Sequence, residues 1–234
     1  MNEQHMDYTE DREELNELLQ VRRDKLKDLY DLGIEPFGER FERTHTAQEI
    51  LDRFDELEEQ DTKITGRIMS MRTHGKASFA DLMDHTGRIQ LYLRVNTLGE
   101  EQYALLEKLD IGDIVGITGK IFRTRRGEIS VEVQGFQFLS KSLRPLPAKW
   151  HGLKDVDLRY RQRYVDLIVN PGVREVFETR SKIIQIMRNF LAERGYIEVE
   201  TPMLHVIAGG AAARPFTTHH NALYMDLYLR IAPE

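Results

Sequence analysis

Residues 75–93 read GKASFADLMDHTGRIQLYL, and their pattern decides the fold of the region around them. Two runs of strand length extend from Ala77 to Asp84 and from Arg88 to Arg94, and in the second run apolar residues recur at every second position, as they do in half-buried strands. The three residues His85-Thr86-Gly87 lie between these runs and are compatible with a tight turn. The stretch therefore predicts an antiparallel pair of strands.

The flanking sequence extends this pair into a barrel. Alternation at Ile64, Gly66 and Ile68 predicts a preceding strand, residues 97–109 have a helical pattern, and strands are expected at 113–122 and 128–139. Three strands, a helix and two strands is the order of the five-stranded OB-fold, whose second and third strands form a face that binds oligonucleotides. We therefore expect an OB-fold domain over residues 62–140.

Residues 1–61 predict a helical extension. Leucines recur at three- and four-residue spacing from Asp11 to Asp31, and Gly33 supplies a stop signal. Thr46 and Glu49 have the spacing of a capping box, which predicts that a second helix begins there.

Residues 141–156 contain Pro145 and Pro147 and predict a linker to a second domain over 157–234. That domain is expected to have a helix at 157–168, a long amphipathic helix at 173–194, a strand at 196–199 and an alternating stretch at 224–232. The apolar stripe of the long helix fits packing against either its own domain or a second subunit. The alternation continues to the last residues, which leads us to expect the N-terminal portion of a longer α+β protein.

The net charge of −6 is unevenly distributed. Residues 1–61 carry 20 Asp or Glu against 8 Lys or Arg, whereas residues 141–163 carry seven Lys or Arg against two Asp. The basic segment fits either a polyanionic partner or a solvated linker. The chain has no cysteine, no run of 18 apolar residues and no leader pattern, so we expect a cytoplasmic protein without a membrane span.

Candidate binding residues lie on the predicted barrel. Phe79 and Gln90 fit a common face, with Arg67, Arg72, Lys76 and Arg88 around it and Glu128 opposite. An exposed ring stacks on an unpaired base, and amide and carboxylate groups read base edges. The alternative is that Phe79 points inward as a core residue. In the second domain, Gly209 and Gly210 fit a loop that holds a small ligand or a tight backbone crossing, and the adjacent His219 and His220 do not form a metal site.

The order of segments resembles the class II aminoacyl-tRNA synthetases and, within them, the bacterial lysyl enzymes. The resemblance is carried by 75–93, SLRPLPAKWHGL (142–153), RYRQRYVDL (159–167), ERGYIEVETPML (193–204) and IAGGAAARPFTTHHNAL (207–223). It covers essentially the whole chain. It implies an anticodon-binding OB-fold followed by the start of an antiparallel-sheet catalytic domain.

The resemblance also implies roles for individual residues. Phe79 would stack on the central anticodon uridine of tRNA(Lys), Gln90 and Glu128 would read it, and Arg67 and Arg72 would contact phosphates. Residues of motif 1 would form a homodimer interface at Pro202, and the lysine α-ammonium would meet Gly210 and Glu234. The implied reaction joins lysine to ATP with Mg²⁺ and then transfers lysine to tRNA.

Two features limit what the resemblance implies. The chain stops at the entrance to motif 2, so the ATP and Mg²⁺ ligands and the catalytic residues are expected beyond Glu234, and this chain alone is not expected to aminoacylate. Tyr224 stands where the family usually has Asp. The alternatives are an RNA-binding module without catalysis and an aspartyl or asparaginyl relative.

Overall fold

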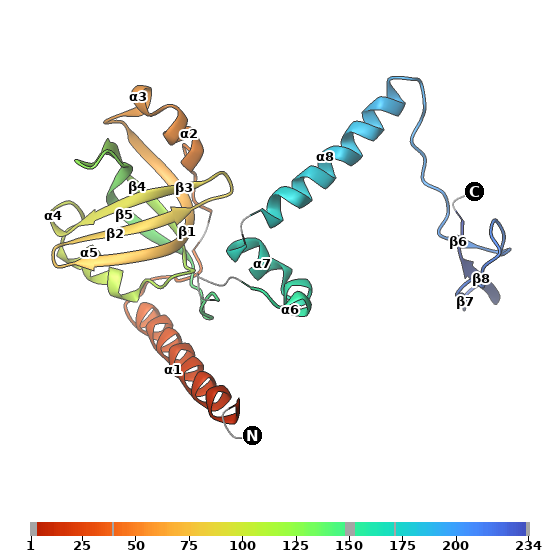
Figure 1. The fold of residues 1–234 in the computed structure, drawn as a ribbon, viewed down its shortest axis with the longest axis horizontal. Coiled ribbons are helices and arrows are strands. Elements are labelled where there is room, and N and C mark those ends of the chain that lie inside the picture. The colour runs from red at the N-terminus through yellow and green to blue at the C-terminus, as the bar shows by residue number, and fades with distance from the viewer. Residues whose placement is uncertain (1–3, 39, 148–152, 171, 233–234) are drawn as a thin grey trace. The chain divides into compact units, whose positions relative to one another are not determined.

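The computed structural model describes residues 4–38, 40–147, 153–170 and 172–232 (Figure 1). The chain divides into two compact units, Met1–Arg161 and Gln162–Glu234. The first contains the barrel and the second contains a long helix and a small sheet.

The barrel is closed, and its strand order is β1-β2-β3-β5-β4. Its strands are β1 (Asp61–His74), β2 (Ala77–Met83), β3 (Arg88–Arg94), β4 (Ile114–Arg123) and β5 (Ile129–Ser140). Neighbouring strands are antiparallel except for β3 and β5, which pair in parallel. The expected OB-fold is confirmed.

Alternation of side chains separates the interior of the barrel from its outer face. On β2 and β3 every second residue is buried. Ala80 and Leu91 therefore point inward, and their neighbours Phe79 and Gln90 point outward. The interior is filled mainly by Ile64, Ile68, Leu82, Ile89, Leu91, Leu93, Val115, Ile117, Ile121, Val131 and Val133.

The first unit also contains helices. They are α1 (Gln4–Asp31), α2 (Ala47–Asp52), α3 (Phe54–Leu57), α4 (Val95–Leu98), α5 (Glu100–Ala104), the 3-10 helix η1 (Leu105–Lys108) and α6 (Val156–Arg161). The capping box of Thr46 and Glu49 is present at the start of α2. The prediction of one helix over 97–109 is wrong, because Gly99, at φ 81°, ends α4 and a separate helix begins after it.

A cluster of buried charged residues connects α1 and the residue after β5 to the segment that precedes β4. Lys141 lies 2.5 Å from a carboxylate oxygen of Asp110 and 2.7 Å from one of Asp113, and its side chain is fully buried. Lys25 of α1 also contacts Asp110, at 2.8 Å. Arg22 of α1 donates hydrogen bonds to the backbone carbonyls of Ile111, Ser142 and Arg144.

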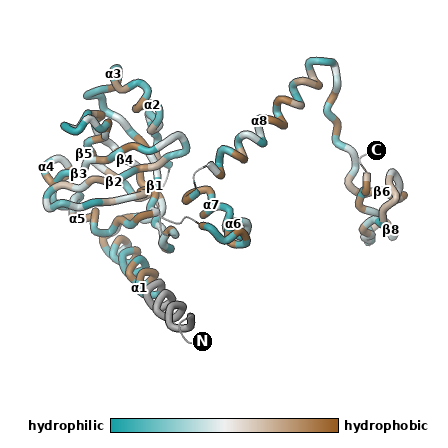
Figure 2. Tube along the Cα trace, viewed as in Figure 1, coloured by the Kyte–Doolittle hydropathy of each residue, from teal (hydrophilic) through white to brown (hydrophobic). Residues whose placement is uncertain are grey.

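The second unit contains α7 (Arg163–Val169), α8 (Val173–Ala192) and a three-stranded sheet of order β6-β8-β7. The strands are β6 (Leu204–His205), β7 (Thr217–His220) and β8 (Met225–Leu229). The single helix predicted over 157–168 is wrong, because the backbone at Gln162 (φ −116°, ψ 53°) leaves the helical region between α6 and α7. No residue of α8 is buried, and Figure 2 shows apolar positions along its length.

The strand predicted at 196–199 is also wrong. These residues have no regular secondary structure, and Ile197 and Val199 are 85% and 72% exposed. Their alternating pattern suits a strand, but a strand needs a neighbouring chain to accept its hydrogen bonds, and none of the described strands pairs with this segment. Among the described helices, none has the combination of length and apolar character required to cross a bilayer.

Candidate nucleic-acid interface

Three aromatic rings form a row on the outer face of the barrel. Phe79 of β2 is half-buried and stacks on Tyr92 of β3, with ring centroids 4.8 Å apart and planes at 23°. The ring of Tyr92 lies 5.8 Å from that of Phe122 of β4. Phe79 therefore does not belong to the interior of the barrel, and its ring is supported from one side by a second ring.

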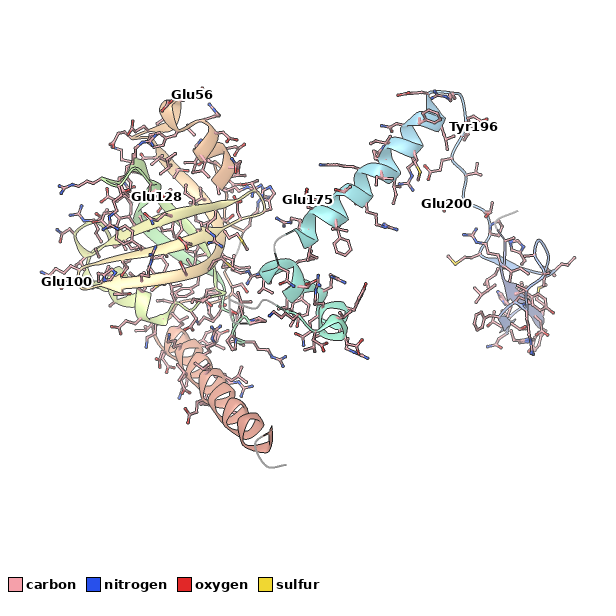
Figure 3. The ribbon with its side chains drawn as sticks, in the orientation of Figure 1. Glu56, Glu100, Glu128, Glu175, Tyr196 and Glu200 are labelled. Carbon is pink, nitrogen blue, oxygen red and sulfur yellow. The ribbon has the colours of Figure 1, made fainter. Side chains whose placement is uncertain are left out.

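Hydrogen-bonding groups lie beside the aromatic row. Gln90 of β3 pairs in register with Ser130 of β5, and the Ser130 hydroxyl donates to the Gln90 side-chain oxygen at 3.0 Å. Glu128 lies two residues before Ser130, is exposed, and is labelled at the edge of the barrel in Figure 3. Gln90 and Glu128 thus lie near the same end of β5.

Cations border the row on two sides. Arg72 of β1 lies directly opposite Phe79 in the β1–β2 register, and its side chain is exposed. Arg94 lies 5.7 Å from the centre of the Tyr92 ring and 3.5 Å from Glu132 of β5. These cations are placed to meet a charged backbone whose bases lie on the rings.

Arg67 lies elsewhere. It is opposite Met83, at the other end of β2 from Phe79, and its guanidinium donates to the carbonyl of Gly112 at 2.6 Å. Burial lowers the pKa of this guanidinium, although Asp113 nearby opposes the change. The structure therefore does not bring Arg67 together with the aromatic row, and it gives this side chain a contact within the barrel.

The turn between β2 and β3 is fixed by Asp84. Its carboxylate accepts hydrogen bonds from the backbone of Ala47 at 2.8 Å, Thr86 at 2.7 Å and Gly87 at 2.9 Å. Partial burial by itself raises the pKa of Asp84, but these hydrogen bonds outweigh it and hold the pKa below its ordinary value. The turn thus fixes both strands that carry Phe79 and Gln90.

Comparison with known proteins agrees with the fold of the barrel. Residues 62–139 match the profile of the OB-fold nucleic acid binding domain, and residues 155–234 match that of the class II tRNA synthetases (D, K and N). Lysine–tRNA ligase of Pelotomaculum thermopropionicum is 67% identical over 222 residues, which cover 95% of this chain and 44% of that protein. The corresponding enzymes of Bacillus subtilis and Clostridium tetani are 56% and 55% identical over 229 and 235 residues, covering 95% and 100% of this chain and 46% and 47% of those proteins. The chain is a homologue of the N-terminal part of lysine–tRNA ligases. It spans a little under half the length of these curated relatives.

Gly210, which is expected at the lysine site, and Pro202, which is expected at the dimer interface, lie in exposed segments of the second unit. Gly210 adopts φ 93°, and a methyl group at the neighbouring Gly209 would meet nothing within 4 Å. Pro202 is exposed, and its carbonyl lies 3.0 Å from a ring nitrogen of His205. Glu234 lies outside the described residues.

The hairpin formed by β7 and β8 contains Tyr224 and the two adjacent histidines. His219 lies 2.8 Å from a carboxylate oxygen of Asp226, and His220 accepts a hydrogen bond from the Leu223 backbone at 3.2 Å. Tyr224 ends the turn at φ 49°, in the left-handed region that suits Asn, Asp and Gly better than an aromatic residue. An Asp, which the resemblance leads us to expect at this position, would suit that backbone.

Three residues on the outer face of the barrel were not predicted from the sequence, namely Tyr92, Phe122 and Ser130. The signal for Tyr92 was present, because it lies two residues after Gln90 on the same strand and so shares its face. Phe122 and Ser130 face each other across β4 and β5. Their position beside Gln90 depends on the parallel pairing of β3 and β5, which is not local in sequence.

Proposed function

We propose that the outer face of β2, β3 and β5 binds the anticodon loop of a lysine tRNA. We propose further that the whole protein activates lysine with ATP and transfers it to that tRNA. The similarity to lysine–tRNA ligases along essentially the whole chain supports the activity, and the geometry of the barrel supports the RNA contact.

The observation that carries this proposal is the position of the Phe79 ring. It lies on the outer face, stacked on Tyr92, with Gln90 on the next strand and Arg72 directly opposite. A ring supported in this way loses little conformational freedom when a base stacks on its other side. Exposed rings with neighbouring amides and cations are the means by which OB-folds hold single-stranded bases.

Binding of an anticodon stem-loop of lysine tRNA to the 234-residue chain tests the proposal. Phe79→Ala should weaken binding by about 1–3 kcal/mol, the range for losing one base stack. Phe37→Ala, which removes a ring that is 45% exposed outside the aromatic row, is the matched control and should leave the affinity unchanged. Equal affinity of the Phe79 variant and the original chain would show that the base does not bind there.

Arg72→Ala gives a second, independent measurement. If Arg72 contacts a phosphate, the slope of log affinity against log salt concentration should become shallower by roughly one unit, with base preference unchanged. An unchanged slope would remove Arg72 from the interface.

The amino acid and the assembly state are tested separately. ATP–pyrophosphate exchange with lysine, aspartate and asparagine, on this chain and on a version extended to the length of its relatives, tests the activity. The described residues include no group of three or more His, Asp or Glu placed to hold a metal ion, so we assign no magnesium ligand here.

The apolar side chains of α8, among them Ile183 and Met187 at 53% and 55% exposed, support a homodimer through this helix and Pro202. Sedimentation velocity tests that assembly.

A further inference from the structure

Arg22 of α1 is a buried cation that joins two distant segments of the chain. Its side chain is 8% exposed. One terminal nitrogen donates to the carbonyl of Ile111 at 3.0 Å, just before β4, and the other donates to the carbonyls of Ser142 and Arg144 at 2.7 and 3.2 Å, just after β5. A buried charge is costly unless its hydrogen-bonding groups find partners. The planar, forked guanidinium satisfies this requirement by bonding to both segments at once.

The helix that carries Arg22 is held to the first unit by further contacts. Lys25 lies 2.8 Å from Asp110, and Asp28 lies 2.6 Å from Lys108. Arg22, Lys25 and Asp28 recur at every third residue, so they lie along one face of α1. The guanidinium is therefore presented by a helix whose position does not depend on the hydrogen bonds of Arg22 alone.

The first residues of the predicted linker follow the surface of the first unit. The backbone N–H of Ser142 donates to the carboxylate of Asp113 at 2.7 Å. Gly112 leaves room for this path, because a methyl group there would lie 2.7 Å from the Ser142 hydroxyl oxygen and 3.6 Å from a side-chain carbon of Leu146. Residues 142–146 are thus fixed on the unit that contains the barrel, although the sequence predicts them to be part of a linker.

We propose that Arg22 is a positioning residue, which fixes the start of the linker so that the chain leaves the barrel along one path. Pro145 and Pro147 restrict the backbone that follows, because their rings fix φ. Two binding modules act together on one ligand most effectively when the connection between them is short and stiff. Fixing residues 142–146 shortens that connection from its start.

This arrangement has a consequence for charging that rests on the proposed function. A tRNA held at its anticodon by the barrel has to receive lysine from the other domain of the same protein. The fixed linker raises the effective concentration of one site for a tRNA bound at the other. Arg22 should therefore matter for charging a whole tRNA, but not for either site alone.

The first experiment measures amide hydrogen exchange in the 234-residue chain and does not depend on the proposed function. Arg22→Met keeps a long side chain without its donors. It should speed exchange at the amides of 142–146 by at least about tenfold, since hydrogen bonds from a charged donor are lost. The amides of Ile117 and Val131, which exchange only when the barrel opens, should change by less than about threefold.

Two other variants accompany Arg22→Met. Arg23→Met is the matched control, because Arg23 is the next residue of α1 and is exposed, and it should leave exchange at 142–146 unchanged. Arg22→Lys keeps the positive charge but lacks the fork that reaches two segments. It should also speed exchange at 142–146, by a smaller factor than Arg22→Met.

The second experiment uses a version extended to the length of the relatives. Arg22→Met should lower kcat/KM for charging a whole lysine tRNA roughly two- to tenfold, as expected for a looser connection. ATP–pyrophosphate exchange with lysine and the affinity for an anticodon stem-loop should both stay within about twofold of the unmodified protein. A merely structural defect would lower all three.

Three results would overturn the inference. These are unchanged exchange at 142–146 in Arg22→Met, equal acceleration at 142–146 and in the barrel, and unchanged charging by the extended Arg22→Met protein. Failure of the unmodified extended protein to charge a lysine tRNA would instead refute the proposed function, and the result of the first experiment would stand.

Discussion

Replacing Lys141 by methionine should destabilise the barrel by about 3–5 kcal/mol, because it removes the cation paired with the buried carboxylate of Asp113 and one of the two cations paired with Asp110. Methionine keeps most of the length of the lysine stem, so the change removes charge more than volume. The ammonium group lies 2.7 Å from Asp113 and 2.5 Å from Asp110, and both Lys141 and Asp113 have fully buried side chains. Asp113 keeps its hydrogen bonds from the backbone of Asp110 and Ser142, so it remains fixed in place while it is unpaired.

The assay is native-state amide hydrogen exchange at buried strand residues such as Ile117 and Val131, whose exchange requires the barrel itself to open. This readout reports on the barrel whatever the second unit does. Lys120→Met is the matched control, because Lys120 also forms an ion pair, with Glu59 at 2.8 Å, but both side chains are open to solvent. An exposed pair of this kind contributes little to stability.

The pH dependence supplies a second check. Partial burial by itself raises the pKa of Asp110, but hydrogen bonds from Lys141 and Lys25 outweigh it and hold the pKa below the ordinary 3.8. The resulting stabilisation is present above pH 3.8 and is lost as the pH falls through the lowered pKa. The difference between the original chain and Lys141→Met should therefore shrink below that pH. A loss under about 1 kcal/mol at neutral pH would show that the cluster is far better solvated than its burial indicates.

Two further changes test smaller features. Asp84→Ala should lower the unfolding free energy at pH 7 by about 1–2 kcal/mol, because the backbone N–H groups of Ala47 and Thr86 lose a charged acceptor. Urea titrations should show this loss becoming smaller as the pH drops below 3.8. A loss that stays undiminished in acid would contradict the role of the ionised carboxylate. Tyr224→Asn should slow amide exchange in the β7–β8 hairpin by an amount that corresponds to roughly 1 kcal/mol, because Asn tolerates φ 49° better than Tyr. Faster exchange would show instead that the exposed ring stabilises the turn.

Local features of the sequence were sufficient to predict the barrel. Apolar residues at every second position, as in Arg88 to Arg94, define a strand within a few residues, and a turn such as 85–87 joins two strands without information from elsewhere. The capping box of Thr46 and Glu49 is likewise complete within four residues. Gly99, which divides the predicted helix over 97–109, was also visible in the sequence.

Features that depend on distant segments were not predictable in this way. The alternation at 196–199 is a genuine strand pattern, yet it becomes a strand only where another strand accepts its hydrogen bonds. Arg67 fits a phosphate contact by residue type, but the fold brings the Gly112 carbonyl to its guanidinium. The sequence left Phe79 open between an exposed ring and a core residue, and both its outward position and its support by Tyr92 required the fold and the β2–β3 register.

The proposed RNA contact lies on a unit that has a hydrophobic core of its own. Every buried apolar side chain among the described residues lies between Leu29 and Phe138, within the first unit. Apolar burial is the main favourable term in folding, so the barrel has a core of its own, and the aromatic row is built on strands that this core fixes. The described part of the second unit has no buried apolar residue. The affinity for an anticodon stem-loop should therefore follow substitutions on the barrel face and be insensitive to those in α8 or the 207–213 loop.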